Sequence, residues 1–289
     1  MDLTLDIPSD VEALKARVRA QWDGAAEGWD RHEASIGRWL DDATAAMIDL
    51  AGIAPGASVL DIAAGSGAQS VQIAKRVGVS GRVVATDLSP SSVEIAKQRL
   101  GALTMAGASA MVADIEALPF EHETFDAVTC RLGLMFLPRP SVGLAEMRRV
   151  LRPGGRAVSV VFSCPERNPC ITTLMRVATA QAGIEPPDPD RPGGLLSLGA
   201  PGLLARLYRE ARFSRVHELV VSAPFRMPSV RAYVDFVRDA AAPVVAILSR
   251  LPEDRREMAY GQIERELEEF RSEDGWEGPN ELVIVWGDA

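Results

Sequence analysis

Strand-like and helix-like segments take turns along the middle of this chain, and no other feature constrains its fold as strongly. Short runs rich in Val, Ile and Ala indicate buried strands, expected at residues 59–62, 82–86, 110–113, 125–130 and 156–162. Segments with apolar residues at helical spacing lie between them, at residues 69–77, 90–100 and 142–151. Such alternation predicts a doubly wound α/β fold, in which a mostly parallel sheet is covered by helices on both faces.

The segments on either side of the alternating pattern predict additions to the core within one structural domain. A capping box that begins at Ser9 and a second helical stretch at 36–50 predict an N-terminal helical cap over residues 1–50. The α/β core is expected at 51–163, and a helical insertion at 164–212.

The C-terminal part, residues 213–289, departs from the alternation. Its two strand-like runs, 216–223 and 282–286, are expected to form an antiparallel pair at the edge of the sheet. Between them, a helical lid at 226–277 is expected to cover a substrate pocket, with helices at 229–238 and 252–270.

Charge and targeting signals narrow the environment and the partners. The chain has 40 acidic and 31 basic residues and a net charge of -9, so its average field repels phosphate backbones and anionic lipids. We therefore expect neither nucleic acid nor membrane as a partner. Residues 1–10 lack the basic and apolar regions of a secretory signal, and the longest near-apolar run, 240–248, is too short to span a bilayer. These features predict a cytoplasmic protein.

The three cysteines are Cys130, Cys164 and Cys170. Their spacing fits neither a CxxC metal site nor a disulfide framework. We expect reduced thiols and no bound metal.

The segment VLDIAAGSG, residues 59–67, indicates where a ligand binds. A strand ends in an acid and runs into a turn of small residues before a helix. In doubly wound sheets such a turn lets a ligand approach the backbone beyond the carboxyl ends of the strands, although a glycine turn alone can simply connect strand to helix. Asp87 ends the next strand, 20 residues past Gly67, where its carboxylate could accept both hydroxyls of a ribose.

Asp61 favours S-adenosylmethionine (SAM) over a dinucleotide as that ligand. Placed at the mouth of the turn, its charge would repel a pyrophosphate about 5 Å away by roughly 3 kcal/mol at an effective dielectric near 20. SAM has no phosphate and carries an ammonium and a sulfonium, which an acid would stabilise. The turn also lacks the third glycine of the dinucleotide fingerprint and has Ser70 there.

With these features the chain resembles the class I SAM-dependent methyltransferases, particularly the small-molecule group that includes the ubiquinone/menaquinone-biosynthesis C-methyltransferases. The resemblance covers roughly residues 58–162 and rests on four segments in the family's order: VLDIAAGSG, VVATDLS, VADIEALPF, and FDAVTCRLGLMFLPRP followed by LRPGG. It implies a Rossmann-like fold and SAM as cofactor, with S-adenosylhomocysteine (SAH) as product. Ala63 departs from the family's D-x-G-x-G-x-G turn by replacing its first glycine.

Carried over position by position, the resemblance implies a set of cofactor-binding residues. It places Ala63, Gly65 and Gly67 along the methionine part and assigns the ribose to Asp87. Leu88 would flank the adenine, Asp114 would accept from its amino group, and the backbone of Ile115 would meet the ring edge. Cys130 and Arg131 would border the methionyl end.

The N-terminal segment adds Trp22, Trp29 and His32, which lie where this family often folds aromatic residues over the cofactor. An indole such as that of Trp29 could make a cation–π contact with the sulfonium, or the two tryptophans could simply anchor the cap. His32 is the candidate general base because His122 and His217 lie in peripheral segments, although a lone histidine is more often structural.

The acceptor is predicted to be a small and largely apolar molecule, methylated on an oxygen, nitrogen or carbon that the residues do not specify. Its pocket is expected to include Leu134, Met135, Arg226 and Tyr233. The resemblance leaves open a monomer or a homodimer.

Two alternative functions stay open: a SAM-binding scaffold or sensor without catalysis, and an NAD-dependent dehydrogenase. A hydrolase with Ser66 as nucleophile would need glycines at 64 and 68, where the chain has alanine.

Overall fold

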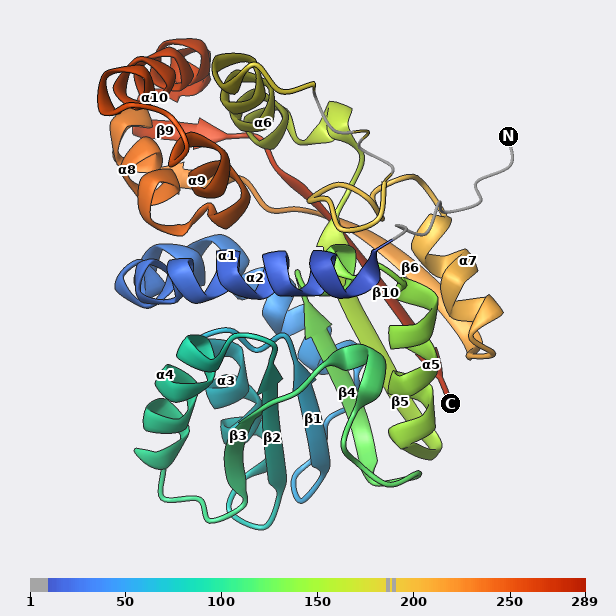
Figure 1. The fold of residues 1–289 in the computed structure, drawn as a ribbon. Coiled ribbons are helices and arrows are strands. Elements are labelled where there is room, and N and C mark those ends of the chain that lie inside the picture. The colour runs from blue at the N-terminus through green and yellow to red at the C-terminus, as the bar shows by residue number, and fades with distance from the viewer. Residues whose placement is uncertain (1–9, 186–187, 189–190) are drawn as a thin grey trace.

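The computed structural model describes residues 10–185, 188 and 191–289, and within them a seven-stranded sheet forms the centre of the molecule (Figure 1). Its strand order is β3-β2-β1-β4-β5-β10-β6. Strands β1 to β5 run parallel to one another, whereas β10 is antiparallel to both β5 and β6. The predicted mostly parallel α/β sheet is confirmed. The strands span β1 Ser58–Ile62, β2 Arg82–Asp87, β3 Ala108–Val112, β4 Phe125–Arg131, β5 Leu151–Phe162, β6 Ser214–Ser222 and β10 Glu281–Asp288.

Helices cover both faces of the sheet, which explains why its inner strands are apolar at consecutive positions. All five residues of β1 are buried. One face carries a row of contacting helices: α2 Glu33–Leu50, α3 Ala68–Val77 and α4 Pro90–Gly101. The other carries α5 Pro140–Val150 and α7 Leu203–Glu210.

Side-chain hydrogen bonds to backbone amides set the starts of two helices near the turn after β1. Ser89 caps α4 as predicted, because its hydroxyl accepts from the Ser92 amide at 3.1 Å and Pro90 occupies the first turn. The N-terminal helix α1, Val11–Arg31, is instead capped by Asp10, whose Oδ1 accepts from the Ala13 amide at 2.9 Å. The predicted capping box began at Ser9, which lies outside the described residues, as does the rest of 1–9.

The predicted edge pair is present, but only β6 lies at the edge. Strand β10 sits between β5 and β6 and pairs with both. Its residues Leu282 to Val285 are buried, whereas most of β6 is exposed, so the more apolar strand takes the inner position. Pro153, Gly154 and Gly155 lie inside β5 as an irregular stretch, where the register with β4 shifts.

Above the carboxyl ends of the strands lies a lid (Figure 1). Its helices are α6 Pro169–Ala182, α8 Val230–Ala240, α9 Ala242–Leu248 and α10 Glu253–Leu267. It also contains a small sheet that we did not predict, made of β7 Phe225–Met227, β8 Arg271–Ser272 and β9 Gly275–Gly278. Strands of two to four residues are too short to show a period in the sequence. Four 3₁₀ turns occur among the residues that the structure describes: η1 Ile115–Ala117, η2 Leu134–Phe136, η3 Pro165–Arg167 and η4 Glu268–Phe270.

Helix α1 crosses the molecule between the sheet and the lid (Figure 1). It contacts α4 of the core on one side and α8 and α9 of the lid on the other. None of the helices in the described part of the chain combines the length and apolarity needed to cross a membrane.

Candidate functional site

A cavity lies between the carboxyl ends of the strands and the lid, with α1 as one wall. Its empty space, counted together with the part open to solvent, is about 1690 Å³. The turn after β1 lines one end of the cavity, and apolar side chains line the other end.

The turn after β1 exposes its backbone to this cavity. Ala63 and Gly65 line it with φ of +52° and +54°, and a Cβ added to Gly65 would meet nothing within 4 Å. Gly67, with φ of +84°, faces the other way, where a Cβ would come within 2.9 Å of the Ala96 Cβ. Glycine here allows α4 to pack closely on the turn. The turn therefore presents main chain and only small side chains, those of Ala63, Ala64 and Ser66, to the cavity, which suits a ligand held close to the backbone.

Asp61 lies beneath the turn and does not line the cavity. Its carboxylate accepts from Gln69 Nε2 at 2.6 Å, Ser70 Oγ at 2.5 Å and Thr129 Oγ1 at 2.8 Å. Burial raises the pKa of Asp61, and these hydrogen bonds oppose the increase. Asp61 therefore ties the start of α3 to the ends of β1 and β4. Ser70, at the position of the missing third glycine, contributes one of these bonds.

Asp87 lines the cavity at the end of β2. Its Oδ2 accepts from the Gly65 amide and its Oδ1 from the Ser89 amide, both at 2.9 Å. Burial raises the pKa of Asp87, while these two backbone donors lower it. Each carboxylate oxygen has a second lone pair, so the side chain can hold the turn and still accept from a ligand's hydroxyls.

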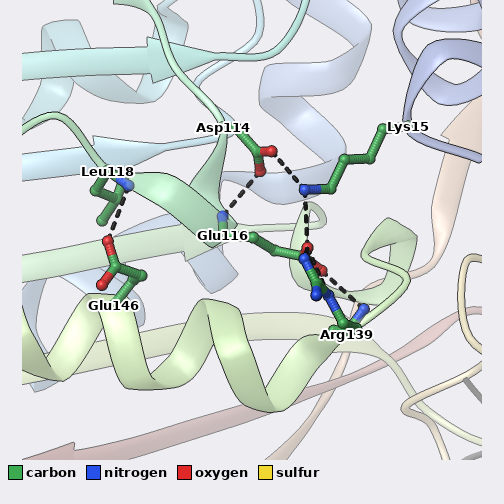
Figure 2. A network of polar contacts seen from close by, with 6 residues as sticks. All are labelled: Lys15, Asp114, Glu116, Leu118, Arg139 and Glu146. Carbon is green, nitrogen blue, oxygen red and sulfur yellow. Dashed lines mark hydrogen bonds and ion pairs between the residues drawn. The ribbon is translucent and has the colours of Figure 1, made fainter. Parts of the chain in front are cut away.

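The next part of the wall comes from Leu88 and the loop after β3. Ala113, Asp114 and Ile115 line the cavity together with Leu88. Asp114 Oδ1 accepts from the Glu116 amide at 2.8 Å, and Lys15 Nζ lies 2.6 Å from Asp114 Oδ2 (Figure 2). The carboxylate predicted to face an adenine thus already has a cationic partner from α1.

The end of β4 contributes a buried thiol and a guanidinium. Cys130 is fully buried outside the cavity lining, and burial together with the charge of Asp61 raises its pKa to about 12. Arg131 does line the cavity, and its Nη1 donates to Thr44 Oγ1 at 2.5 Å. Burial lowers the pKa of Arg131 to about 10, so the side chain remains cationic at neutral pH. Gly133 follows, packed against Ala63.

The far end of the cavity is almost entirely apolar. Trp29 and Trp39 line it, but their indole N–H groups already donate to the Ala240 and Ala223 carbonyls, at 2.8 and 2.9 Å. Met135 and Tyr233 also line it, and Tyr233 stacks on Trp276 with ring centroids 4.6 Å apart. Other members of this wall are Ile36, Phe162, Ile171, Leu174, Leu195, Phe225, Phe236, Val237 and Val244.

Three residues that we predicted as catalytic or substrate-binding lie outside the lining. His32 Nε2 is 3.0 Å from Asp239 Oδ2, at the junction of α1 and the lid. Arg226 is exposed and pairs with Glu277 at 3.1 Å. Leu134 is fully buried in η2, next to the lining residue Met135.

Sequence reasoning missed Lys15, Trp39 and most aromatic residues of the lid. Lys15, Val18, Trp22, Ala26 and Trp29 follow each other at three- and four-residue spacing and form the cavity-facing side of α1. That spacing was visible in the sequence and could have identified Lys15. Phe162, Phe225 and Phe236 carry no such signal. Within residues 10–185, 188 and 191–289, no group of three His, Cys, Asp or Glu side chains could hold a metal ion.

Comparisons with known proteins agree with this arrangement. Residues 59–155 match a family model described as a methyltransferase domain. The ubiquinone/menaquinone biosynthesis C-methyltransferase UbiE of Marinomonas sp. (strain MWYL1) is 39% identical over 120 residues, or 41% of this chain and 48% of that protein. The chain thus spans about half the length of the curated relatives it matches.

Solved structures share the fold over most of the chain. One, in the complex of the Haloferax volcanii Trm112 methyltransferase activator with a methyltransferase, has a TM-score of 0.58 and 21% identity, covering 94% of this chain and 97% of that one. Another is a geranyl diphosphate C-methyltransferase from Streptomyces coelicolor A3(2), solved with Mg²⁺, geranyl diphosphate and SAH. Its TM-score is 0.52 and its sequence identity is 16%, and the match covers 86% of this chain and 80% of that one. The matched segment, the strand order and the open turn after β1 together make this part of the chain similar to a methyltransferase domain, and in particular to that of the UbiE C-methyltransferases.

Proposed function

We propose that this chain transfers the methyl group of SAM to a small, largely apolar molecule. One observation carries the proposal: a single cavity connects the turn after β1, Asp87 and Asp114 to an aromatic and aliphatic wall supplied by the lid. The first end has the chemistry to hold a nucleoside, and the second can hold an apolar molecule beside it. SAM, when bound, supplies an electrophilic methyl group on its sulfonium.

The chemistry of the residues at the first end suits SAM. The open cradle at Ala63 and Gly65 would take the methionine part, and Asp87 would accept the ribose hydroxyls. Leu88 and Ile115 would flank the adenine, and Asp114 would accept from its amino group. Arg131 places a positive charge in the same wall, which suits a carboxylate.

Asp61 and Gly67 would act on the cofactor through the shape of the turn, because neither lines the cavity. Asp61 holds the ends of β1, β4 and α3 together, and Gly67 brings α4 close. Cys130 would serve as a buried, protonated thiol behind the turn. Trp29 lines the cavity from α1 and stays the candidate for an aromatic contact with the sulfonium.

The protein's main contribution would be to hold the two molecules in line and exclude water. Positioning of this kind is worth effective molarities of roughly 10⁵–10⁸ M in good cases. The apolar wall supplies few polar groups, because the indole N–H groups of Trp29 and Trp39 are engaged elsewhere. Tyr233 is the phenol of this wall and would orient a polar group of the acceptor. We propose a neutral acceptor, since an anion would have to leave water for this apolar wall.

The two alternatives are less well supported. The comparisons do not favour a dehydrogenase, since the matched family model is a methyltransferase domain and the curated relatives are methyltransferases. A scaffold that binds SAM without catalysis would have no need of a second, apolar compartment open to the cofactor end.

Calorimetric titration of the purified protein with SAM, SAH and NAD tests the cofactor. We expect micromolar binding of SAM and SAH and no binding of NAD. Binding of NAD alone would refute the proposed methyl transfer and favour a hydride-transfer enzyme. Formation of SAH in the presence of neutral aromatic or prenylated acceptors then tests catalysis. A protein that binds SAM but forms SAH with no acceptor across such a panel would be assigned to the scaffold alternative.

A further inference from the structure

Lys15 joins α1 to the loop that forms the predicted adenine end of the cavity. Its ammonium lies 2.6 Å from Asp114 Oδ2 and 2.8 Å from Glu116 Oε2 (Figure 2). The Lys15 side chain is only 13% exposed and lines the cavity. Burial alone would lower the pKa of Lys15, but the hydrogen bonds to Asp114 and Glu116 outweigh it and the pKa is raised. Lys15 is therefore held as a cation at the cavity wall.

The loop beneath Lys15 has its own supports, so it does not depend on this lysine for its shape. Glu116 is 1% exposed, and Arg139 donates to it from its backbone amide at 2.8 Å and from its guanidinium at 2.7 and 3.0 Å. Asp114 also accepts from the Glu116 amide, and Leu118 donates to Glu146 at 2.9 Å (Figure 2). Removing the ammonium of Lys15 would detach the first turns of α1 from this loop, while these bonds keep the loop in place. The middle of α1 would stay on α4, because Asp23 accepts from Ser89 Oγ at 2.6 Å and from the Ser91 amide at 3.1 Å.

The other end of α1 is packed tightly against the lid. A Cβ added to Gly28 would lie 2.0 Å from the Asp239 carbonyl oxygen, so the two backbones touch there. Trp29 Nε1 donates to the Ala240 carbonyl, and Arg31 and His32 both contact the Asp239 carboxylate. His32 is also the non-helical residue between α1 and α2. It is 17 residues from Lys15, or about 25 Å along a helix.

We infer that Lys15 is a latch for cofactor exchange: its ion pairs hold the N-terminal half of α1 closed over the adenine end, and they must break for the cofactor to enter or leave. The first turns of α1 would swing away from the loop, while Asp23 and the contacts with the lid hold the rest of the helix in place. Val18, which also lines the cavity, lies in the part that moves. This inference rests on the proposed function, because it takes SAM and SAH as the molecules that occupy the site.

A latch has a kinetic signature that an ordinary binding contact lacks. If closure limits both entry and exit, removing the latch raises the association and dissociation rates together and leaves Kd almost unchanged. A residue that merely contacts the cofactor raises the dissociation rate alone. Hydrogen bonds between charged groups are strong enough for a change of roughly tenfold in each rate.

Stopped-flow measurement of SAH binding, followed by the intrinsic tryptophan fluorescence to which Trp22 and Trp29 in the cavity wall contribute, tests the latch. Lys15→Met removes the ammonium and keeps an unbranched side chain, and Lys15→Gln provides a second neutral variant should the first unfold. Arg17→Met is the matched control, because it removes one positive charge from an exposed position of the same helix.

We expect both SAH rate constants to rise roughly tenfold in the Lys15 variants and to stay at the wild-type values in Arg17→Met. A rise in the dissociation rate alone, or unchanged rates in folded Lys15 variants, would overturn the latch and leave the proposed function standing. If the wild-type protein does not bind SAH at all, both the proposed function and the latch are refuted.

Discussion

The close packing of Gly133 on Ala63, in the turn after β1, can be tested by a pair of reciprocal substitutions. Ala63 stands where related turns have glycine, in a left-handed conformation with φ of +52°. Opposite it, a Cβ added to Gly133 would lie 2.2 Å from the Ala63 Cβ and 3.1 Å from Cys130 Sγ. Carbon atoms in contact normally keep about 3.5–4.0 Å. Because both Cβ atoms are fixed to the backbone, only a shift of the turn or of residue 133 could relieve the overlap.

We therefore expect Gly133→Ala to lower the free energy of unfolding by about 1–3 kcal/mol, the usual cost of overpacking, and to weaken SAH binding. Ala63→Gly should be slightly stabilising, since relief of about 1–2 kcal/mol from the left-handed alanine exceeds the roughly 0.4–1 kcal/mol lost to the greater freedom of glycine in the unfolded chain. In the double variant the nearest atom of residue 63 is its Cα, at an ordinary 3.7 Å, so most of the lost stability should return.

Urea unfolding of the wild type, both single variants and the double variant measures this coupling directly, and calorimetry with SAH reports on the cavity. We expect a coupling free energy of about 1–3 kcal/mol that favours the double variant. The reasoning would be refuted by a Gly133→Ala protein as stable as the wild type, or by a double variant no more stable than Gly133→Ala. Either result would mean that the turn is free to move away from Gly133.

Three further predictions concern the remaining polar contacts. Asp87→Ala should weaken SAH binding by about 1–3 kcal/mol in calorimetry, as expected for losing charge-assisted hydrogen bonds, and an unchanged affinity would remove Asp87 from the ribose site. His32→Ala should leave turnover unchanged and lower the free energy of unfolding by about 0.5–1 kcal/mol, since His32 meets Asp239 and not the cavity; a large loss of turnover at unchanged SAH affinity would restore it as the general base. Burial on its own would raise the pKa of Asp288, but Arg156 and Arg215, at 2.6 and 2.5 Å, outweigh it and lower that pKa below 3.8. The carboxylate therefore stabilises the fold above about pH 4, and this contribution is lost as the pH falls through the folded pKa of Asp288. The difference in free energy of unfolding between wild type and Asp288→Asn should accordingly be constant at neutral pH and shrink in acid. A difference that does not depend on pH would contradict this.

The meeting of Ala63, Gly65 and Asp87 at one end of the cavity could be predicted from the sequence because it depends on local features. Ala63, Gly65 and Asp87 lie at the ends of consecutive parallel strands, and such ends meet at one edge of the sheet in any fold of this kind. For the same reason the cap of α4 at Ser89 was predictable from a few neighbouring residues.

The predictions for Asp61, His32 and Arg226 depended on the direction in which each side chain points, and sequence spacing does not specify direction. Asp61 turns inward to Gln69, Ser70 and Thr129 instead of facing the cavity. His32 turns to the lid and Arg226 to Glu277. In each case a polar partner from another element stabilises an orientation that no local pattern encodes.

The sequence by itself determined the order of strands and helices, the parallel sheet and the open turn that exposes its backbone, because periodicity and glycine act over a few residues. Only the tertiary structure decided that β10 would lie between β5 and β6, that the lid would supply the apolar wall, and that Lys15 would meet Asp114 across 99 residues of chain. Such contacts depend on how whole elements pack, and packing is set by the shape and burial of many side chains at once.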